Sequence, residues 1–154
     1  LGVSWHEVTR ELDAGDIATQ QKVIIDDGLS YAQINQVLAE KGAELMLSLL
    51  SDLSTGSLLM TAQEPELASY YAYPDVQDFT IDTAWTAQHA YNFMRATQAF
   101  GHGYRCQIDS HSFLLDTALD YDNNQSSSAA TVKGNVLYIP CKDGVLMATF
   151  TAKL

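Results

Sequence analysis

The sequence predicts an α/β segment followed by a mostly β domain that carries one helix. Three features predict this α/β + β class: a strand–loop–strand–helix pattern over residues 1–54, a connector without periodicity over 55–79, and a helix followed by short strands over 80–154. With 154 residues and 47% hydrophobic composition, the chain is large enough to bury a substantial core. One ordinary domain or two small ones are therefore expected.

The first segment begins with two strand patterns joined by a charged loop. Val3 and Trp5 alternate with polar residues, as is typical of a half-buried strand. Residues 9–15 are charged and rich in turn formers, and residues 17–25 favour a second strand that ends at the turn 26–28. The two strands are therefore expected to flank an exposed loop.

A helix follows these strands. Ser30 and Gln33 have the spacing of a capping box, which predicts that the helix begins directly after Ser30. Gly42 costs a helix about 1 kcal/mol relative to alanine, so it is expected to allow close packing rather than to mark a break. Apolar residues recur on one face at helical spacing, namely Tyr31, Ile34, Leu38, Leu45 and Leu49.

The connector contains several glycine and proline residues and the aromatic string 70–73. Its tyrosines are interpreted as side chains packed on a neighbouring domain, with a ligand-stacking surface as the alternative. A helix over 84–99, capped by Asp82 or Thr83, opens the last segment. Strand patterns follow at 104–108, 112–119, 131–139 and 145–151. One helix with several short antiparallel strands suggests a small barrel.

Charge is distributed unevenly. The formal net charge is −11, and residues 1–78 hold 13 Asp and Glu against 3 Lys and Arg, whereas 79–154 hold 6 against 5. No cluster of Lys and Arg exists to release counterions from phosphates, which argues against a nucleic-acid surface. No run of 18 apolar residues and no secretory signal pattern is present, so no membrane contact is expected. The start without Met fits a piece of a longer protein.

Cysteine and histidine spacing gives no sign of a metal site. Cys106 and Cys141 lie in apolar strand-like segments without a C-x-x-C spacing, so buried thiols are expected and a disulfide stays open. The four histidines show no pair at ligand spacing beside a carboxylate, so no metal is expected; they are His6, His89, His102 and His111. His89 is interpreted as a solvated or core-edge side chain.

Residues 2–6 (Gly-Val-Ser-Trp-His) and 13–17 (Asp-Ala-Gly-Asp-Ile) carry a family resemblance. They resemble the signature of formyltransferases that use 10-formyltetrahydrofolate, in which a strand ending in Gly-Val-Thr/Ser-x-His leads into a loop closing on Asp-x-Gly-x-Ile. Residues 81–104, 134–137 and 142–144 are similar to the barrel domain of methionyl-tRNA formyltransferase-like proteins. The chain thus resembles the C-terminal half of such a protein.

The resemblance implies a domain layout. Residues 1–54 would be the C-terminal part of a doubly wound, Rossmann-like formyltransferase catalytic domain, 55–79 a linker, and 80–154 a C-terminal OB-like barrel domain. An incomplete sheet of this kind exposes strand edges and apolar helix faces, so a homo-oligomer is expected. The protein is expected to be cytoplasmic.

The resemblance also implies site residues. Asp13 takes the catalytic role of fixing a histidine and holding a water, while His6 lies at the edge of the formyl-transfer site. The folate-binding loop comprises Thr9, Arg10, Glu11 and Leu12, whose backbone groups would line the pterin pocket. Arg10 would meet a folate carboxylate or, preferably, pair with a neighbouring glutamate at the surface. The family's catalytic Asn and His lie upstream of residue 1, so residues 1–154 alone are expected to be inactive.

The expected function of the parent protein is transfer of a formyl group from 10-formyltetrahydrofolate, the only cofactor implied, to a primary amine. Formyl transfer needs a stabilised tetrahedral intermediate, removal of an amine proton and protonation of the leaving folate nitrogen. Methionyl-tRNA, an amino sugar on a nucleotide and an aminoacyl group on a biosynthetic carrier are the conceivable acceptors. The layout favours tRNA and the acidic charge disfavours it. A catalytically inactive binding module is the alternative.

Overall fold

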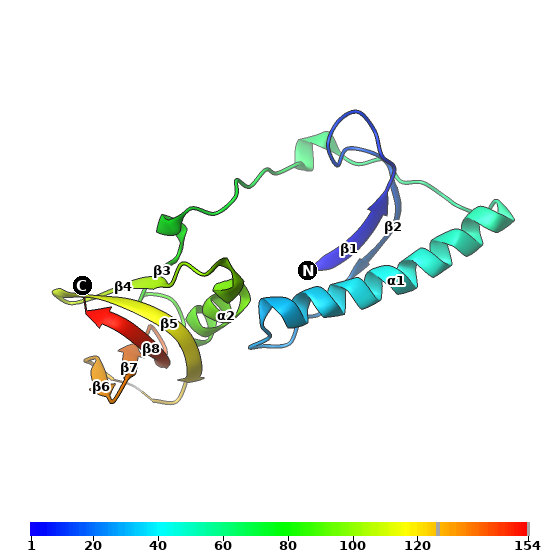
Figure 1. Cartoon of the computed structure of the whole chain (residues 1–154). Coiled ribbons are helices and arrows are strands. Elements are labelled where there is room, and N and C mark those ends of the chain that lie inside the picture. Colours follow the sequence, from blue (N-terminus) through cyan, green and yellow to red (C-terminus); the bar gives the residue numbers. More distant parts are fainter. Residues whose placement is uncertain (126, 154) are drawn as a thin grey trace. The chain divides into compact units, whose positions relative to one another are not determined.

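The computed structural model describes residues 1–125 and 127–153 (Figure 1). Two compact units divide the chain: residues 1–26 together with 32–72, and residues 27–31 together with 73 onward. Residues 27–31 thus group with the second unit, although most of the long helix that begins at Tyr31 belongs to the first. Among the described residues, no helix has the length and apolar character that a membrane crossing requires.

The first unit contains one pair of strands and one long helix. Strand β1 (Gly2–His6) pairs antiparallel with β2 (Ile17–Lys22), with an irregularity in register between Trp5 and His6. Both predicted strands are confirmed, although β2 ends three residues earlier than the apolar pattern suggested. The two strands form a sheet of their own among the described residues. The mixed α/β class of this segment is therefore observed, while a complete doubly wound sheet is not present.

Helix α1 (Tyr31–Thr55) begins directly after Ser30, as predicted. Most of its predicted apolar face is half-buried, and Gly42 is its one buried residue. A Cβ at Gly42 would lie 3.4 Å from Cγ1 of Val3, and the Gly42 carbonyl accepts a hydrogen bond from Nε1 of Trp5 at 3.0 Å. The prediction that this glycine allows close packing is confirmed.

The connector contains two short 3₁₀ helices, η1 (Pro65–Leu67) and η2 (Val76–Asp78). Tyr70 and Tyr71 are about nine-tenths exposed, at 87% and 91%. Their interpretation as packed side chains is wrong, because both are almost fully exposed. Tyr73 differs, since its ring meets Phe100 edge-on with 5.6 Å between ring centroids.

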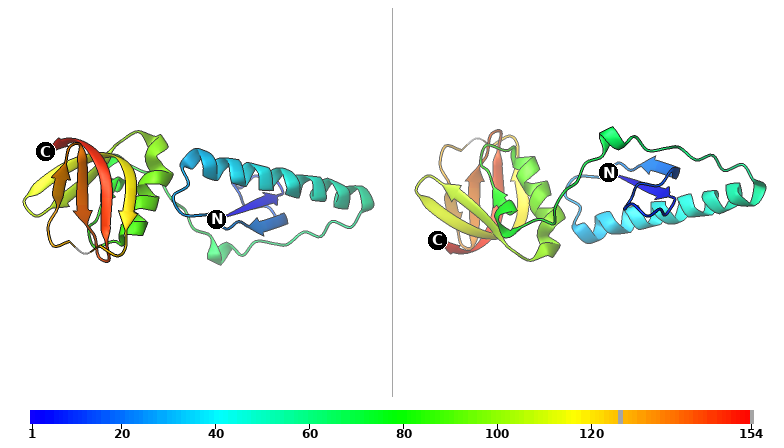
Figure 2. Two further views of the ribbon diagram at one scale, coloured as in Figure 1. Left: turned by 90° about the horizontal axis from the view of Figure 1, so that it is seen from below. Right: turned by 90° about the horizontal axis from the view of Figure 1, so that it is seen from above.

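The second unit is a six-stranded sheet with a helix against it (Figure 2). The strands follow in the order β3-β4-β5-β8-β7-β6 and are antiparallel except for the pair β3 and β4. Their bounds are β3 Thr80–Ile81, β4 Tyr104–Ile108, β5 His111–Asp122, β6 Thr131–Lys133, β7 Val136–Pro140 and β8 Val145–Lys153. Helix α2 (Ala87–Thr97) and the 3₁₀ helix η3 (Gln98–Phe100) lie between β3 and β4 in the sequence.

The predicted barrel is not closed. Strands β3 and β6 stand at the two edges of the sheet and do not pair with each other within the described part of the chain. The single strand predicted over 131–139 is also wrong, because it is the hairpin of β6 and β7. Gly134 turns this hairpin with φ of 63°, a left-handed conformation that glycine adopts without steric cost.

The cap of α2 also differs from the prediction. The helix begins at Ala87, and the Thr86 hydroxyl accepts the His89 amide at 3.1 Å. The Asp143 carboxylate accepts the Ala87 amide at 2.9 Å. Asp82 instead accepts the Ala84 amide at 2.8 Å in the preceding turn. The cap is therefore formed by the adjacent Thr86 together with Asp143, a side chain that lies 56 residues from Ala87 in the sequence.

The main core lies in the second unit, between α2 and the sheet. Its largest fully buried side chains include Phe79, Ile81, Met94, Leu115, Leu137, Ile139 and Leu146. Cys106 is buried there and Cys141 is half-buried, and both are free thiols, which confirms the expectation of unpaired cysteines. Burial raises the pKa of the Cys106 thiol to about 12, with smaller contributions from Cys141 and Asp82.

Candidate functional site

The loop between β1 and β2 closes through its backbone. The Glu7 amide donates to the Asp16 carbonyl at 2.9 Å, which brings the two ends of the loop together. Gly15 is buried inside this closure, and a Cβ there would lie 2.0 Å from the Glu7 carbonyl oxygen. Any side chain at this position would overlap the backbone. This overlap explains why the 13–17 motif has a glycine at residue 15.

A segment after α1 holds the same loop from outside. The amides and carbonyls of Ile17 and Thr61 exchange hydrogen bonds at 2.8 and 2.9 Å. The Gln63 side-chain amide donates to the carbonyls of Asp13 at 2.8 Å and Gly15 at 2.6 Å. Sequence reasoning did not identify Thr61 or Gln63, because contacts over more than 40 residues leave no local pattern. The loop conformation is therefore fixed from two sides.

Within this loop, Asp13 and His6 are brought together. Asp13 has a φ of 55°, a left-handed conformation that Asp tolerates better than most residues. Its Oδ1 lies 3.6 Å from Nε2 of His6, while Nδ1 of His6 lies 2.9 Å from the Glu7 carbonyl oxygen. The carbonyl can only accept, so Nδ1 carries a proton and donates it. Nε2 consequently faces the carboxylate, and the contact becomes an ion pair when the imidazole is protonated.

Both members of this pair are reachable from solvent. The side chain of Asp13 is 79% exposed and that of His6 is 29% exposed. The carboxylate is therefore free to hold water or a ligand group on the side that does not face His6. A carboxylate beside an imidazole is an arrangement that can take part in proton transfer.

The other predicted site residues lie on the exposed part of the loop. Thr9, Arg10, Glu11 and Leu12 are all exposed, and the Thr9 hydroxyl donates to the Glu11 carbonyl at 2.9 Å. The structure thus places all six predicted residues on β1 and one loop. Within the described ranges, Arg10 forms no ion pair with Glu7 or Glu11.

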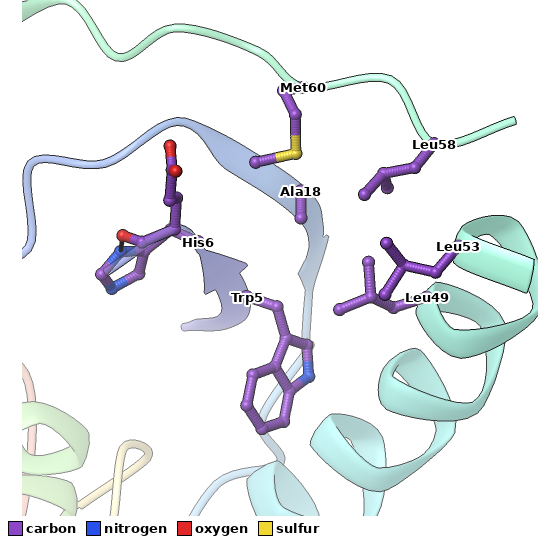
Figure 3. Close-up of a pocket in the computed structure, with 8 residues that line it drawn as sticks. Trp5, His6, Ala18, Leu49, Leu53, Leu58 and Met60 are labelled. Carbon is purple, nitrogen blue, oxygen red and sulfur yellow. Dashed lines mark hydrogen bonds between the residues drawn. The ribbon is translucent and has the colours of Figure 1, made fainter. Parts of the chain in front are cut away.

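An open groove of about 410 Å³ lies beside His6 in the first unit. His6 and Glu7 supply its polar lining, and Asp13 does not line it. Figure 3 shows the side chains of α1 and of the segment after it facing β1 and β2 across this groove. Its apolar lining consists of Trp5, Ala18, Leu49, Leu53, Leu58 and Met60. The groove is thus an apolar surface that has its polar groups at the end of β1.

Two of the other histidines, His89 and His102, contact aromatic side chains. His102 lies against Phe79 with 4.9 Å between ring centroids, and the exposed His89 meets Trp85 at 4.7 Å, in agreement with a core-edge position. Gly101 and Gly103 both have φ near 70°, which supports the tight turn expected there. Within residues 1–125 and 127–153, no three His, Cys, Asp or Glu side chains are arranged to hold a metal ion.

Comparison with known proteins shows extensive similarity to methionyl-tRNA formyltransferases. The chain is 36% identical over 138 residues to that of Carboxydothermus hydrogenoformans, covering 90% of this chain and 43% of the relative. It is 26% identical over 148 residues to that of a Sulfurihydrogenibium species, covering 96% of this chain and 46% of the relative. The chain therefore spans less than half the length of these relatives. No protein-family model matches it.

A solved structure shows the same fold. The N-formyltransferase of Helicobacter canadensis, determined with folinic acid and dTDP-3-aminofucose, superposes with a TM-score of 0.71 at 15% identity. The superposition covers 99% of this chain and 55% of that protein. At this identity the likeness concerns the fold alone, and it covers residues of both units. The chain corresponds to the C-terminal part of a formyltransferase-like protein, as the motif at residues 2–17 indicated.

Proposed function

We propose that the protein containing this chain transfers a formyl group from 10-formyltetrahydrofolate to a primary amine. One observation carries the proposal: the loop between β1 and β2 holds the Asp13 carboxylate 3.6 Å from the His6 imidazole, at the motif that resembles the formyltransferase signature. The relatives named methionyl-tRNA formyltransferase support the reaction class. The structural neighbour determined with folinic acid supports a folate as formyl donor.

The proposal assigns roles within the loop. Asp13 is the catalytic residue, which orients an imidazole and holds a water that shuttles protons. His6 lies at the edge of the folate site. The backbone of the exposed segment contacts the pterin through its amide and carbonyl groups, and that segment consists of Thr9, Arg10, Glu11 and Leu12. Exposure of these four residues leaves their backbone accessible, which supports the assignment.

The domain layout forms a second part of the proposal. Residues 1–54 are assigned to the end of a formyltransferase catalytic domain, 55–79 to a linker, and 80–154 to a C-terminal domain related to the OB fold. The open, mostly antiparallel sheet with one helix is compatible with a partly open barrel. Limited proteolysis of the full-length protein tests it, with cleavage expected near the exposed residues Tyr70 and Tyr71.

The decisive experiment replaces Asp13 by Asn in the full-length protein. Asparagine keeps the size of the side chain and tolerates the left-handed backbone, so folding is retained while the charge is lost. Turnover is expected to fall by about 100-fold or more, because positioned acid–base groups contribute that much. The measurement is formyl transfer from 10-formyltetrahydrofolate to an amine acceptor, together with the melting temperature.

Asp16→Asn is the matched control, because Asp16 closes the loop only through its backbone carbonyl. This variant is expected to keep its turnover. Full activity of Asp13→Asn would remove Asp13 from the mechanism. Absence of transfer in the wild-type full-length protein would favour the alternative, a catalytically inactive binding module.

A further inference from the structure

The turn that precedes α1 bonds to helix α2. Residues 27–31 belong to the second unit, as α2 does. The Gly28 amide donates to Oδ1 of Asn92 at 2.8 Å, and Nδ2 of Asn92 donates to Oδ1 of Asp27 at 2.9 Å. The amide side chain of Asn92 thus acts as acceptor towards one turn residue and as donor towards the other.

Two further side chains of α2 bind the same turn. Nε2 of Gln88 donates to Oδ2 of Asp27, and Nε of Arg95 donates to the Gly28 carbonyl at 3.1 Å. Asn92 and Arg95 follow Gln88 by about one and two helical turns, so the three side chains share one face of the helix. This face therefore satisfies both carboxylate oxygens of Asp27 and both backbone polar groups of Gly28.

The shape of this face selects glycine at position 28. Gly28 has a φ of 72°, a left-handed conformation that glycine adopts without steric cost. A Cβ there would lie 2.9 Å from Cε1 of Tyr91. The Tyr91 ring is itself packed against Tyr121 of β5, with 5.2 Å between ring centroids, which restricts its movement. The face of α2 thus fits an aspartate followed by a left-handed glycine, and the turn has this sequence.

The turn also changes how the second unit is connected to the rest of the chain. The chain passes between the two units three times: after Asp26, after Tyr31 and after Ala72. The connector supplies only the last of these passages. A domain held by one exposed linker is released when that linker is cut, whereas a domain that binds a further segment of the chain is retained.

We infer that helix α2 is the docking surface for an Asp–Gly turn of the same chain, residues 27–28, and that this docking makes the C-terminal domain discontinuous in sequence. The domain assigned to 80–154 then includes residues 27–31, and the turn holds it in addition to the connector. Asn92 is the central residue of the docking, because its side chain bonds to both turn residues. The inference concerns the binding of one segment and does not depend on formyl transfer.

Amide hydrogen exchange in the full-length protein tests the docking directly. The Gly28 amide lies in no helix or strand, and Asn92 is its hydrogen-bond acceptor. Its exchange is expected to be slower than in an unstructured peptide by at least about tenfold, because exchange requires the turn to leave α2. Asn92→Asp removes the donor to Asp27 and places a second carboxylate beside it, so exchange is expected to accelerate about tenfold.

A second substitution separates docking from general folding. Adding Asp27→Asn to Asn92→Asp restores one carboxylate and one amide at this contact, with donor and acceptor reversed. The new carboxylate at 92 still accepts the Gly28 amide, and Gln88 still finds an acceptor oxygen at position 27. Exchange in the double variant is expected to return to within about threefold of wild type. A general loss of folding would not be reversed in this way.

Cutting the connector tests whether the turn holds the domain. A protease recognition sequence is inserted between the exposed residues Tyr71 and Ala72, and the cleaved full-length protein is analysed by gel filtration. The piece from residue 72 onward is expected to co-elute with the remainder. It is expected to separate in Asn92→Asp and to co-elute again when Asp27→Asn is added. Asn135→Asp is the matched control, because it adds the same charge in the exposed turn between β6 and β7.

Several outcomes would overturn the inference. Unprotected exchange of the Gly28 amide in wild type would show that the turn does not dock. Separation of the cleaved pieces without any substitution, or their retention in Asn92→Asp, would show that the turn does not hold the domain. Equal effects of Asn92→Asp and Asn135→Asp, or no rescue by Asp27→Asn, would remove Asn92 from the docking. Since no measurement involves folate or an amine, each result is independent of the proposed reaction.

Discussion

Single residues of the loop after β1 hold positions that few other residue types can occupy. Asp13 has a left-handed backbone, and Gly15 lies where a Cβ would overlap the Glu7 carbonyl oxygen. The carboxylate that the proposed chemistry needs is therefore supported by backbone geometry as well as by its contact with His6. This relation explains why the motif at 13–17 combines an acid and a glycine two residues apart.

Gly15→Ala is expected to destabilise the chain. An added Cβ at 2.0 Å from the Glu7 oxygen forces the loop to open, and such overpacking costs about 1–3 kcal/mol. Urea unfolding followed by circular dichroism measures the loss. Gly56→Ala measures backbone strain without overlap, because a Cβ there meets nothing within 4 Å while its φ of 70° costs a non-glycine residue about 1–2 kcal/mol. A Gly15→Ala variant as stable as wild type would contradict the steric role of this glycine.

Cys106 predicts a pH dependence of stability. Its pKa is raised from 9.0 to about 12, chiefly by burial, so the unfolded chain loses the thiol proton at lower pH than the folded chain. Above pH 9 the unfolded state therefore binds fewer protons, and stability falls as pH rises towards 12. The slope is at most about 1.4 kcal/mol per pH unit for one group.

Urea unfolding between pH 7 and 10.5 measures this slope. Tyr104 adds to it with the same sign, because burial raises the pKa of its hydroxyl as well. Cys106→Ala is expected to decline less steeply than wild type above pH 9, since it lacks the thiol. Parallel stability curves for the two proteins would show that the Cys106 thiol does not titrate differently in the folded state.

Among the helices and strands, those defined by local sequence patterns have bounds close to the predicted ones. Strand β4 alternates buried and exposed residues along its whole length, and α1 begins directly after Ser30, so both bounds were predicted. The start of α2 was not predicted, because Asp143 supplies part of its cap from across the second unit. The order of the six strands was not predicted for a similar reason, since the pairing of strands distant in the sequence leaves no local pattern.

In the candidate site, too, the local motif was predictive and the contacts with distant segments were not. The resemblance assigned His6 and Asp13 to one site without predicting a contact between them, and the structure shows this contact. The motif did not predict that Gln63 binds the loop or that Leu53 and Met60 form a groove beside His6. These residues belong to segments more than 40 positions later, and their side chains are ordinary for a helix or a connector.

Helix α1 offers a test of packing at the scale of an element. Gly42→Ala removes a residue that costs a helix about 1 kcal/mol, and the new methyl group would lie 3.4 Å from Val3 Cγ1, an ordinary contact distance. The Trp5 hydrogen bond uses the backbone carbonyl and is kept. We expect a gain of up to about 1 kcal/mol in the free energy of unfolding by urea titration. A loss of similar size would show that β1 cannot shift to accommodate the added methyl group.

At the scale of the whole molecule, the charge and the exposed apolar surface point to different partners. The acidic balance of −11 disfavours contact with nucleic acid. Exposed leucines on α1 favour contact with another apolar surface, because Leu47 is 71% exposed and Leu50 is 53% exposed. A helix with apolar side chains on opposite faces is normally covered on both. The chain spans less than half of its relatives, so such cover is expected from the parent protein or from a second copy.

The isolated 154-residue chain is therefore expected to self-associate. Analytical ultracentrifugation over a range of concentrations should show a monomer–dimer equilibrium or larger species, because exposed apolar patches drive association. The double variant Leu47→Gln and Leu50→Gln should shift this equilibrium towards monomer, whereas Leu119→Gln, an exposed leucine of the second unit, should leave it unchanged. A wild-type chain that stays monomeric at high concentration would show that the exposed leucines of α1 do not drive association. An equal response to Leu119→Gln would instead assign the contact to another surface.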